Sequence, residues 1–237
     1  MTNASTPLRD EEPLLQRFKS LESKKISPSA KMLVWQAFGV LGETLFKKYP
    51  PDLSQRKNGK RLLNLGCGEV RIPGFVNADF YRLHKLYATN RPDWMLDITR
   101  PLKCQNDYWD GIIMEHVNEH ITYVANYYLF QELYRTLKSG GVLRIVVPDL
   151  DKYLQFKVRD NEEKKMNRYG SLPEAISNLT QNHSHISTWN YDLLSTVLAE
   201  VGFSHISKQN FGEGIDPDLL VDSPNHVWQS SYCEAIK

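Results

Sequence analysis

Short apolar runs alternate with polar or amphipathic segments through the middle of the chain, which is typical of an α/β fold. From residue 60 onward, turn or helix residues separate these runs, which read as strands. They are Arg61–Leu65, Gly74–Phe80, Trp94–Asp97, Trp109–Met114 and Val142–Val147. Because the last run is nearly all apolar and rich in β-branched residues, we expect a mostly parallel sheet covered on both faces.

Other segments have the texture of helices or of an antiparallel strand pair. The expected helices are Glu11–Glu22, Ser29–Tyr49, Val124–Lys138 and Asn190–Val201. We expect the third of these to end at Ser139-Gly140-Gly141 and the fourth at Gly202. The closing runs, Phe203–Phe211 and His226–Ile236, predict an antiparallel pair at the edge of the sheet.

The length of 237 residues suits one well-buried domain with a small appendage. We expect residues 1–59 to form an N-terminal tail and helical cap, and residues 60–237 to form the α/β domain. Within that domain, the charged and partly helical segment 151–190 reads as a lid-like insertion.

Composition narrows the class of protein further. Lys and Arg total 29 against 28 Asp and Glu, and this net charge of +1 argues against a dedicated nucleic-acid binder. Three scattered cysteines are too few for a disulfide framework or a zinc cluster, which favours a reducing, cytoplasmic location. The first thirty residues lack the apolar core of a secretory signal, and Met32–Phe46 is too short to span a membrane.

A glycine loop, Gly66-Cys67-Gly68, follows the first predicted strand. Such a loop lets the backbone approach a ligand closely, although a simple turn has the same pattern. Arg71 stands where the dinucleotide fingerprint requires its third glycine, which disfavours a nicotinamide oxidoreductase. Only Glu69–Phe75 separates the loop from the next strand, so a phosphate-binding helix has little room.

Two aspartates lie at the ends of the next two predicted strands. Asp79 can accept both hydroxyls of a ribose, and Asp97 can accept a hydrogen bond from an exocyclic amine such as that of adenine. The alternatives are a solvated strand-end carboxylate for Asp79 and a turn or cap for Asp97. Together with the glycine loop, they describe a pocket for a nucleoside with no phosphate requirement.

These motifs, taken in order, resemble class I S-adenosylmethionine-dependent methyltransferases of the type 11 kind. The resemblance covers Arg61–Leu150 most strongly and Tyr191–Lys237 less so, with Ser139 in place of a usual proline. The segments that carry it are LNLGCG, WDGIIMEHVNEHI, LKSGGVLRIVVPDL, AEVGF and YCEAIK. The shortened glycine loop is similar to that of a subgroup of small predicted methyltransferases often linked with surface polysaccharide.

The resemblance implies a Rossmann-like, mostly parallel seven-stranded sheet with helices on both faces, a C-terminal antiparallel strand pair and an N-terminal helical cap. Residues 60–237 would then be the methyltransferase domain. The implied cofactor is S-adenosyl-L-methionine, which leaves as S-adenosyl-L-homocysteine. The residues assigned to its binding are Leu65, Gly66, Cys67, Gly68, Asp79, Phe80, Asp97, Ile98 and Glu115.

The chemistry is expected just after the fourth strand, at His116, Glu119 and His120. A histidine suits removal of a proton from an acceptor hydroxyl or ammonium, and His116 is nearest the strand end. Glu119 or His120 would orient it, or else this pair braces the helix. These residues could also join His183 or His185 around a divalent metal. The spacing is not diagnostic, however, because Glu115 is one position away from the E-x-x-E-H form, so we assign no metal ligand.

The acceptor is expected to meet the insertion, where Tyr153, His183, His185 and Trp189 are the candidate substrate-binding residues. We expect methyl transfer to an oxygen or nitrogen of a small-molecule or saccharide acceptor. The alternatives are a metal-assisted enzyme similar to RNA 2′-O-methyltransferases, and a non-catalytic module that binds an adenosyl ligand.

Overall fold

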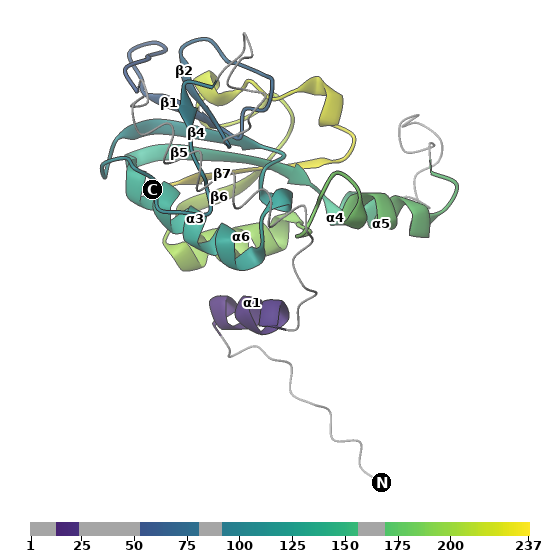
Figure 1. The fold of residues 1–237 in the computed structure, drawn as a ribbon. Helices are drawn as coiled ribbons and strands as arrows, with labels where there is room; N and C mark the ends of the chain where they lie inside the picture. Colours follow the sequence, from purple (N-terminus) through teal and green to yellow (C-terminus); the bar gives the residue numbers. More distant parts are fainter. Residues whose placement is uncertain (1–12, 24–52, 81–91, 156–168) are drawn as a thin grey trace.

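The computed structural model describes residues 13–23, 53–80, 92–155 and 169–237, which include a seven-stranded sheet (Figure 1). The strand order is β3-β2-β1-β4-β5-β7-β6. The strands are β1 Leu62–Leu65, β2 Phe75–Asp79, β3 Trp94–Met95, β4 Trp109–Glu115, β5 Leu137–Pro148, β6 Ser204–Gln209 and β7 Ser230–Ile236. β1 to β5 pair in parallel, and β7 is antiparallel to both β5 and β6. The predicted Rossmann-like sheet and its C-terminal antiparallel pair are confirmed.

The longer helices α3 (Tyr123–Thr136) and α6 (Tyr191–Val201) lie together on one face of the sheet (Figure 1). Alternate strand residues such as Leu63, Ile112 and Leu143 point to this face and are fully buried in the main core. The remaining helices are α1 Leu14–Ser23, α4 Leu150–Leu154 and α5 Leu172–Gln181. None of the helices in the described segments is long and apolar enough to cross a membrane.

The opposite face of the sheet is covered in part by the connection between β6 and β7. Leu62 and Ile113 pack there against Leu219 of the 3-10 helix η5 (Pro217–Leu219). A Cβ atom on Gly111 would lie 3.1 Å from the Leu219 side chain, so this contact is close. Within the described residues, 3-10 helices and loops between β6 and β7 therefore cover this face.

The predicted bounds of α6 are confirmed, and those of α3 need a correction. Asn190 caps α6 by accepting a hydrogen bond from the Leu193 amide, and Gly202 ends it with a φ of 116°. α3 ends at Thr136, ahead of the glycines to which we assigned its end. Leu137 is fully buried and pairs with Trp109, so the LKSGG segment begins β5 instead of ending the helix.

The N-terminal segment packs on the domain through α1, which matches the expected helix Glu11–Glu22. Phe18 stacks on Tyr123 with ring centroids 5.0 Å apart. The Glu22 carboxylate accepts a hydrogen bond from the Val124 amide at the start of α3. The other helix expected in the N-terminal cap, Ser29–Tyr49, lies outside the described residues.

A buried arginine links the sheet to the segment that covers its second face. The guanidinium of Arg144 on β5 is fully buried and donates to the carboxylates of Asp222 and Glu234. It also donates to the carbonyl oxygen of Glu213 at 2.9 Å. Burial would lower the pKa of Arg144, but both carboxylates outweigh it and raise the pKa. This network ties β5, β7 and the β6–β7 connection together.

We expect Arg144→Leu to destabilise the protein by about 3–5 kcal/mol, because it leaves two buried carboxylates without their cation. Lys138→Ala, which removes an ion pair between Lys138 and Asp110 that is partly exposed to solvent, should cost less than about 1 kcal/mol. The free energies of unfolding in urea measure both. Equal losses in the two variants would contradict the role given to Arg144.

Candidate functional site

The parallel register brings three strand ends to one level of the sheet edge. Leu65 of β1 aligns with Ala78 of β2 on one side and with Met114 of β4 on the other. The next residues along these strands are Gly66, Asp79 and Glu115. In open α/β sheets this carboxyl edge is where ligands bind, so the predicted cofactor residues meet where a ligand is expected.

The glycine loop is hydrogen-bonded to β2, and its two glycines are required for different structural reasons. The amides of Gly66 and Cys67 donate to the Ala78 carbonyl oxygen at 2.8 and 3.0 Å. Gly66 has a φ of 78°, and a Cβ atom there would lie 2.2 Å from Val117. Gly68 has a φ of 57°, but a Cβ atom there would meet nothing within 4 Å. The loop backbone is therefore packed at Gly66 and open at Gly68.

Asp79 fastens this loop to the end of β2. Its carboxylate accepts hydrogen bonds from the amides of Gly68 at 2.7 Å and Phe80 at 2.6 Å. A carboxylate offers about four acceptor positions, so it can hold the loop and the two hydroxyls of a ligand together. The open backbone at Gly68 and the acidic end of β2 therefore fit a nucleoside with a free ribose diol.

The remaining residues assigned to the cofactor have structural contacts of their own. Asp97 accepts hydrogen bonds from the amide and hydroxyl of Thr99, as a turn-capping aspartate does. Both oxygens of Glu115 lie 3.1 Å from the Ser223 amide, and burial raises the pKa of Glu115. Leu65 is fully buried in the core, and Ile98 packs against it. Their contacts with a cofactor remain predictions.

His116 lies directly after β4 in a conformation that few non-glycine residues adopt. Its φ is 53°, which marks a constrained position. Its Nδ1 atom lies 3.1 Å from Oε1 of Glu119, and its Nε2 atom lies 2.9 Å from Oγ of Ser230. The His226 ring lies 4.4 Å away, centroid to centroid. Both ring nitrogens of His116 thus face polar partners.

Glu119 is the buried centre of a histidine cluster, which we define as His116, His120 and His185 around this carboxylate. Its side chain is 2% exposed and belongs to the 3-10 helix η2 (Asn118–His120). Within the described residues neither carboxylate oxygen accepts a well-formed hydrogen bond, and the nearest imidazole nitrogen is Nδ1 of His116, 3.1 Å from Oε1. Burial raises the pKa of Glu119, but the polar contact with His116 and then the charge interactions with His116 and His120 outweigh this and lower the pKa overall.

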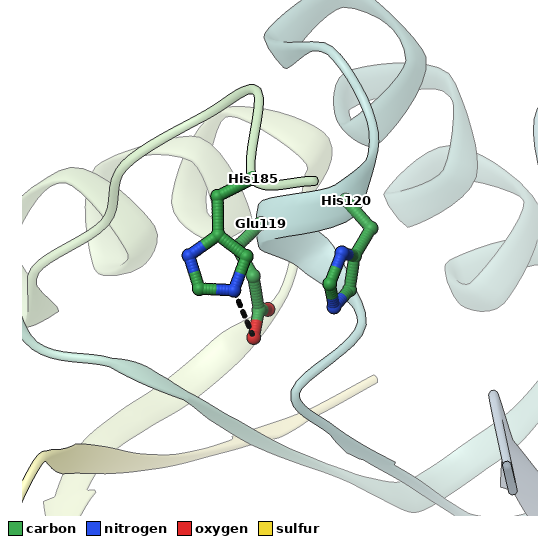
Figure 2. Close-up of side chains that lie close together, drawn as sticks. All are labelled: Glu119, His120 and His185. Atoms are coloured by element: carbon green, nitrogen blue, oxygen red, sulfur yellow. Dashed lines mark ion pairs between the residues drawn. The ribbon is translucent and has the colours of Figure 1, made fainter. Parts of the chain in front are cut away.

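The end of the insertion is hydrogen-bonded onto η2. The amides of Ile186 and Ser187 both donate to the Glu119 carbonyl oxygen, at 2.8 and 3.2 Å. This pairing places His185 beside Glu119, with Nε2 4.0 Å from Oε1. Figure 2 shows the imidazoles of His185 and His120 on either side of the Glu119 carboxylate. The two rings make an edge-on contact at 5.0 Å.

The structure separates the candidate acceptor residues into two groups. Trp189 and Tyr153 are each 1% exposed and hold the fold: Trp189 donates to the Ser187 hydroxyl, and Tyr153 donates to the Gln229 side chain. His185 lies in the histidine cluster, and the His183 ring lies 5.8 Å from it. The roles of all four residues in acceptor binding remain predictions.

The sequence analysis missed Ser230, the partner of His116 Nε2. The two residues are 114 positions apart. They meet because β7 pairs with β5 in a register that aligns Ser230 with Pro148. No local pattern around Ser230 indicates this contact, since it depends on the pairing of distant strands.

Comparisons with solved structures return methyltransferases at low similarity. No family model and no curated protein matches the chain. A SAM-dependent methyltransferase from Archaeoglobus fulgidus is 18% identical, over 88% of this chain and 100% of its own, with a TM-score of 0.48. A SAM-dependent methyltransferase from Thermotoga maritima, a possible histamine N-methyltransferase, is 14% identical over 94% and 98%, with a TM-score of 0.47. Since both TM-scores are below 0.5, our assignment of the fold rests on the strand order and register.

The two loop glycines should respond differently to alanine. We expect Gly66→Ala to lower the free energy of unfolding by about 2–4 kcal/mol, because it adds both a clash with Val117 and a strained φ. Gly68→Ala adds only the strained φ and should cost about 1–2 kcal/mol. Urea unfolding of both variants tests this order. A Gly68→Ala loss as large as that of Gly66→Ala would contradict the packing described for the loop.

Proposed function

We propose that the protein is an S-adenosylmethionine-dependent methyltransferase that acts on an oxygen or nitrogen of a small-molecule or saccharide acceptor. One observation carries the proposal. The Asp79 carboxylate accepts a hydrogen bond from the Gly68 amide at the carboxyl edge of the sheet, and His116 and Glu119 follow the end of β4 at the same edge, on the other side of β1. The proposed ribose-binding acid at the end of β2 and the proposed proton acceptor after β4 thus lie at one edge of the sheet, on the two strands that flank β1.

On the cofactor side, the loop Gly66–Gly68 would hold the ligand through its backbone, and Asp79 would accept the ribose hydroxyls. S-adenosylmethionine carries a methyl group on a positively charged sulfur. The acceptor atom would attack the methyl carbon in line with the carbon–sulfur bond, and S-adenosylhomocysteine would leave. Positioning provides much of the acceleration in such a displacement. The tight fit of Gly66 against Val117 and the bond between Asp79 and Gly68 give the rigidity that positioning needs.

On the acceptor side, His116 would take the proton from the acceptor hydroxyl or ammonium. Glu119 faces Nδ1, so it favours the tautomer that carries the proton there and leaves Nε2 basic. The Ser230 hydroxyl lies 2.9 Å from Nε2 and holds the ring in place. The acceptor group would replace this hydroxyl as the partner of Nε2 during the reaction.

The net charge of the chain bears on the class of acceptor. A net charge of +1 gives little general attraction for nucleic acid, so we favour a small molecule or a saccharide over RNA. Binding of RNA that weakens steeply with salt would favour the alternative instead. A non-catalytic module would bind the adenosyl ligand and transfer no methyl group.

Loss of the acid at the end of β2 should weaken cofactor binding. We expect Asp79→Asn to bind S-adenosylhomocysteine at least about 10-fold more weakly, because hydrogen bonds to a charged group contribute about 1.5–3 kcal/mol. Asp93→Asn is the matched control, since Asp93 also accepts a backbone amide bond, from Asn77. Calorimetric titration measures both. Wild-type affinity in a folded Asp79→Asn protein would rule out the ribose assignment.

Loss of the proton acceptor should slow turnover without affecting cofactor binding. We expect His116→Asn, which tolerates a positive φ, to bind S-adenosylhomocysteine normally and to turn over at least about 100-fold more slowly. His205→Asn is the control, because His205 is also a histidine with a positive φ of 47° but lies on β6, at the far edge of the sheet. Transfer of isotope-labelled methyl groups to compounds in a cell extract, followed by mass spectrometry, gives the rates and the acceptor. Undiminished transfer by His116→Asn would remove this residue as the base.

A further inference from the structure

We propose that Glu119, His120 and His185 bind a divalent transition-metal ion of the zinc class. One ligand atom from each side chain lies within 4.8 Å of the other two. Glu119 and His120 come from η2, and His185 precedes α6, so the site joins the end of β4 to the insertion (Figure 2). The sequence suggested such a cluster as an alternative without choosing between His183 and His185, and the structure brings His185 into it.

The ligand set suits this class of ion. Two imidazoles and one carboxylate bind zinc and related metals, and they leave coordination positions open. Ligands about 2.1 Å from a tetrahedral zinc ion lie about 3.4 Å apart, so side-chain movements of about an ångström would close the site. His120 is exposed, which gives its side chain room for such a movement.

His185 is already oriented as a metal-binding histidine. Its Nδ1 atom lies 2.6 Å from the Leu179 carbonyl oxygen, to which it donates a hydrogen bond. In a neutral imidazole this leaves the lone pair on Nε2, the atom that faces Glu119 at 4.0 Å. A backbone carbonyl on the other ring nitrogen is the usual outer partner of a metal-binding histidine.

The surroundings of Glu119 provide independent support. The carboxylate is almost fully buried, yet within the described segments neither of its oxygens accepts a well-formed hydrogen bond. A buried carboxylate needs a positive partner. The distance of 4.0 Å to His185 Nε2 is too long for a hydrogen bond, but it suits two ligands of one ion. His116 Nδ1, at 3.1 Å from Oε1, would then be the outer partner of the ligating carboxylate.

The site also indicates the chemistry of the acceptor, a step that rests on the proposed methyl transfer. Divalent ions of this class accept oxygen ligands at their open positions. An acceptor hydroxyl would therefore be able to bind the ion, whereas an ammonium group would do so only after it has lost its proton.

The direct test is titration of the full, untagged chain with Co²⁺, followed through its visible absorption, and with Zn²⁺ by calorimetry. We expect one ion per chain. His120→Ala and His185→Ala should each weaken binding at least about 10-fold, the smallest loss expected when even an outer partner is removed. His205→Ala, which removes an exposed histidine from β6, should bind like the wild type.

Two controls keep the outcome clear. Circular dichroism and S-adenosylhomocysteine affinity, measured without added metal, show whether each variant remains folded. Absence of saturable Co²⁺ binding, or equal binding by the wild type and both histidine variants, would overturn the metal site. A protein that binds Co²⁺ but no S-adenosylhomocysteine would overturn the proposed function and leave the metal site standing.

Discussion

The parallel pairing of β1 with both β2 and β4 is the constraint on which the rest of the site depends. Because Leu65 aligns with Ala78 and Met114 at once, the residues that follow these strands must emerge at one edge. A shift of one residue in either pairing would turn side chains to the opposite face and separate Asp79 from the glycine loop. The buried residues of β1, all apolar except Asn64, make such a shift costly.

The packing of the second face is physically joined to this site. Arg144 holds Asp222, and the next residue, Ser223, donates its amide to Glu115 at the end of β4. The same strand pairing that brings Glu234 to Arg144 brings Ser230 to His116. The ion pairs of Arg144 and the contacts around His116 therefore depend on the same strand pairing and the same connection between β6 and β7.

The sequence predicted the parts of the fold that depend on local pattern. The buried strands and the caps of α6 follow from neighbouring residues, and so does the glycine loop next to Asp79. The predicted end of α3 was wrong because the glycines of LKSGG resemble a helix stop. In the structure Leu137 is buried and pairs with Trp109, so β5 begins there. The contact between Ser230 and His116 could not be predicted, because the pairing of distant strands creates it. The choice of His185 over His183 as the neighbour of Glu119 could not be predicted either, because it depends on how the insertion docks on η2.

The charge balance around Glu119 determines what this cluster can be. A carboxylate buried to this degree stays ionised only beside positive charge, which either protonated imidazoles or a bound cation can supply. Among the described imidazoles, Nδ1 of His116 lies 3.1 Å and Nε2 of His185 lies 4.0 Å from Oε1 of Glu119, and neither makes a well-formed hydrogen bond to it. His185 donates its Nδ1–H to the Leu179 carbonyl oxygen and turns Nε2 toward Glu119. In a neutral imidazole Nε2 offers a lone pair, so this orientation suits a cation bound between the two side chains.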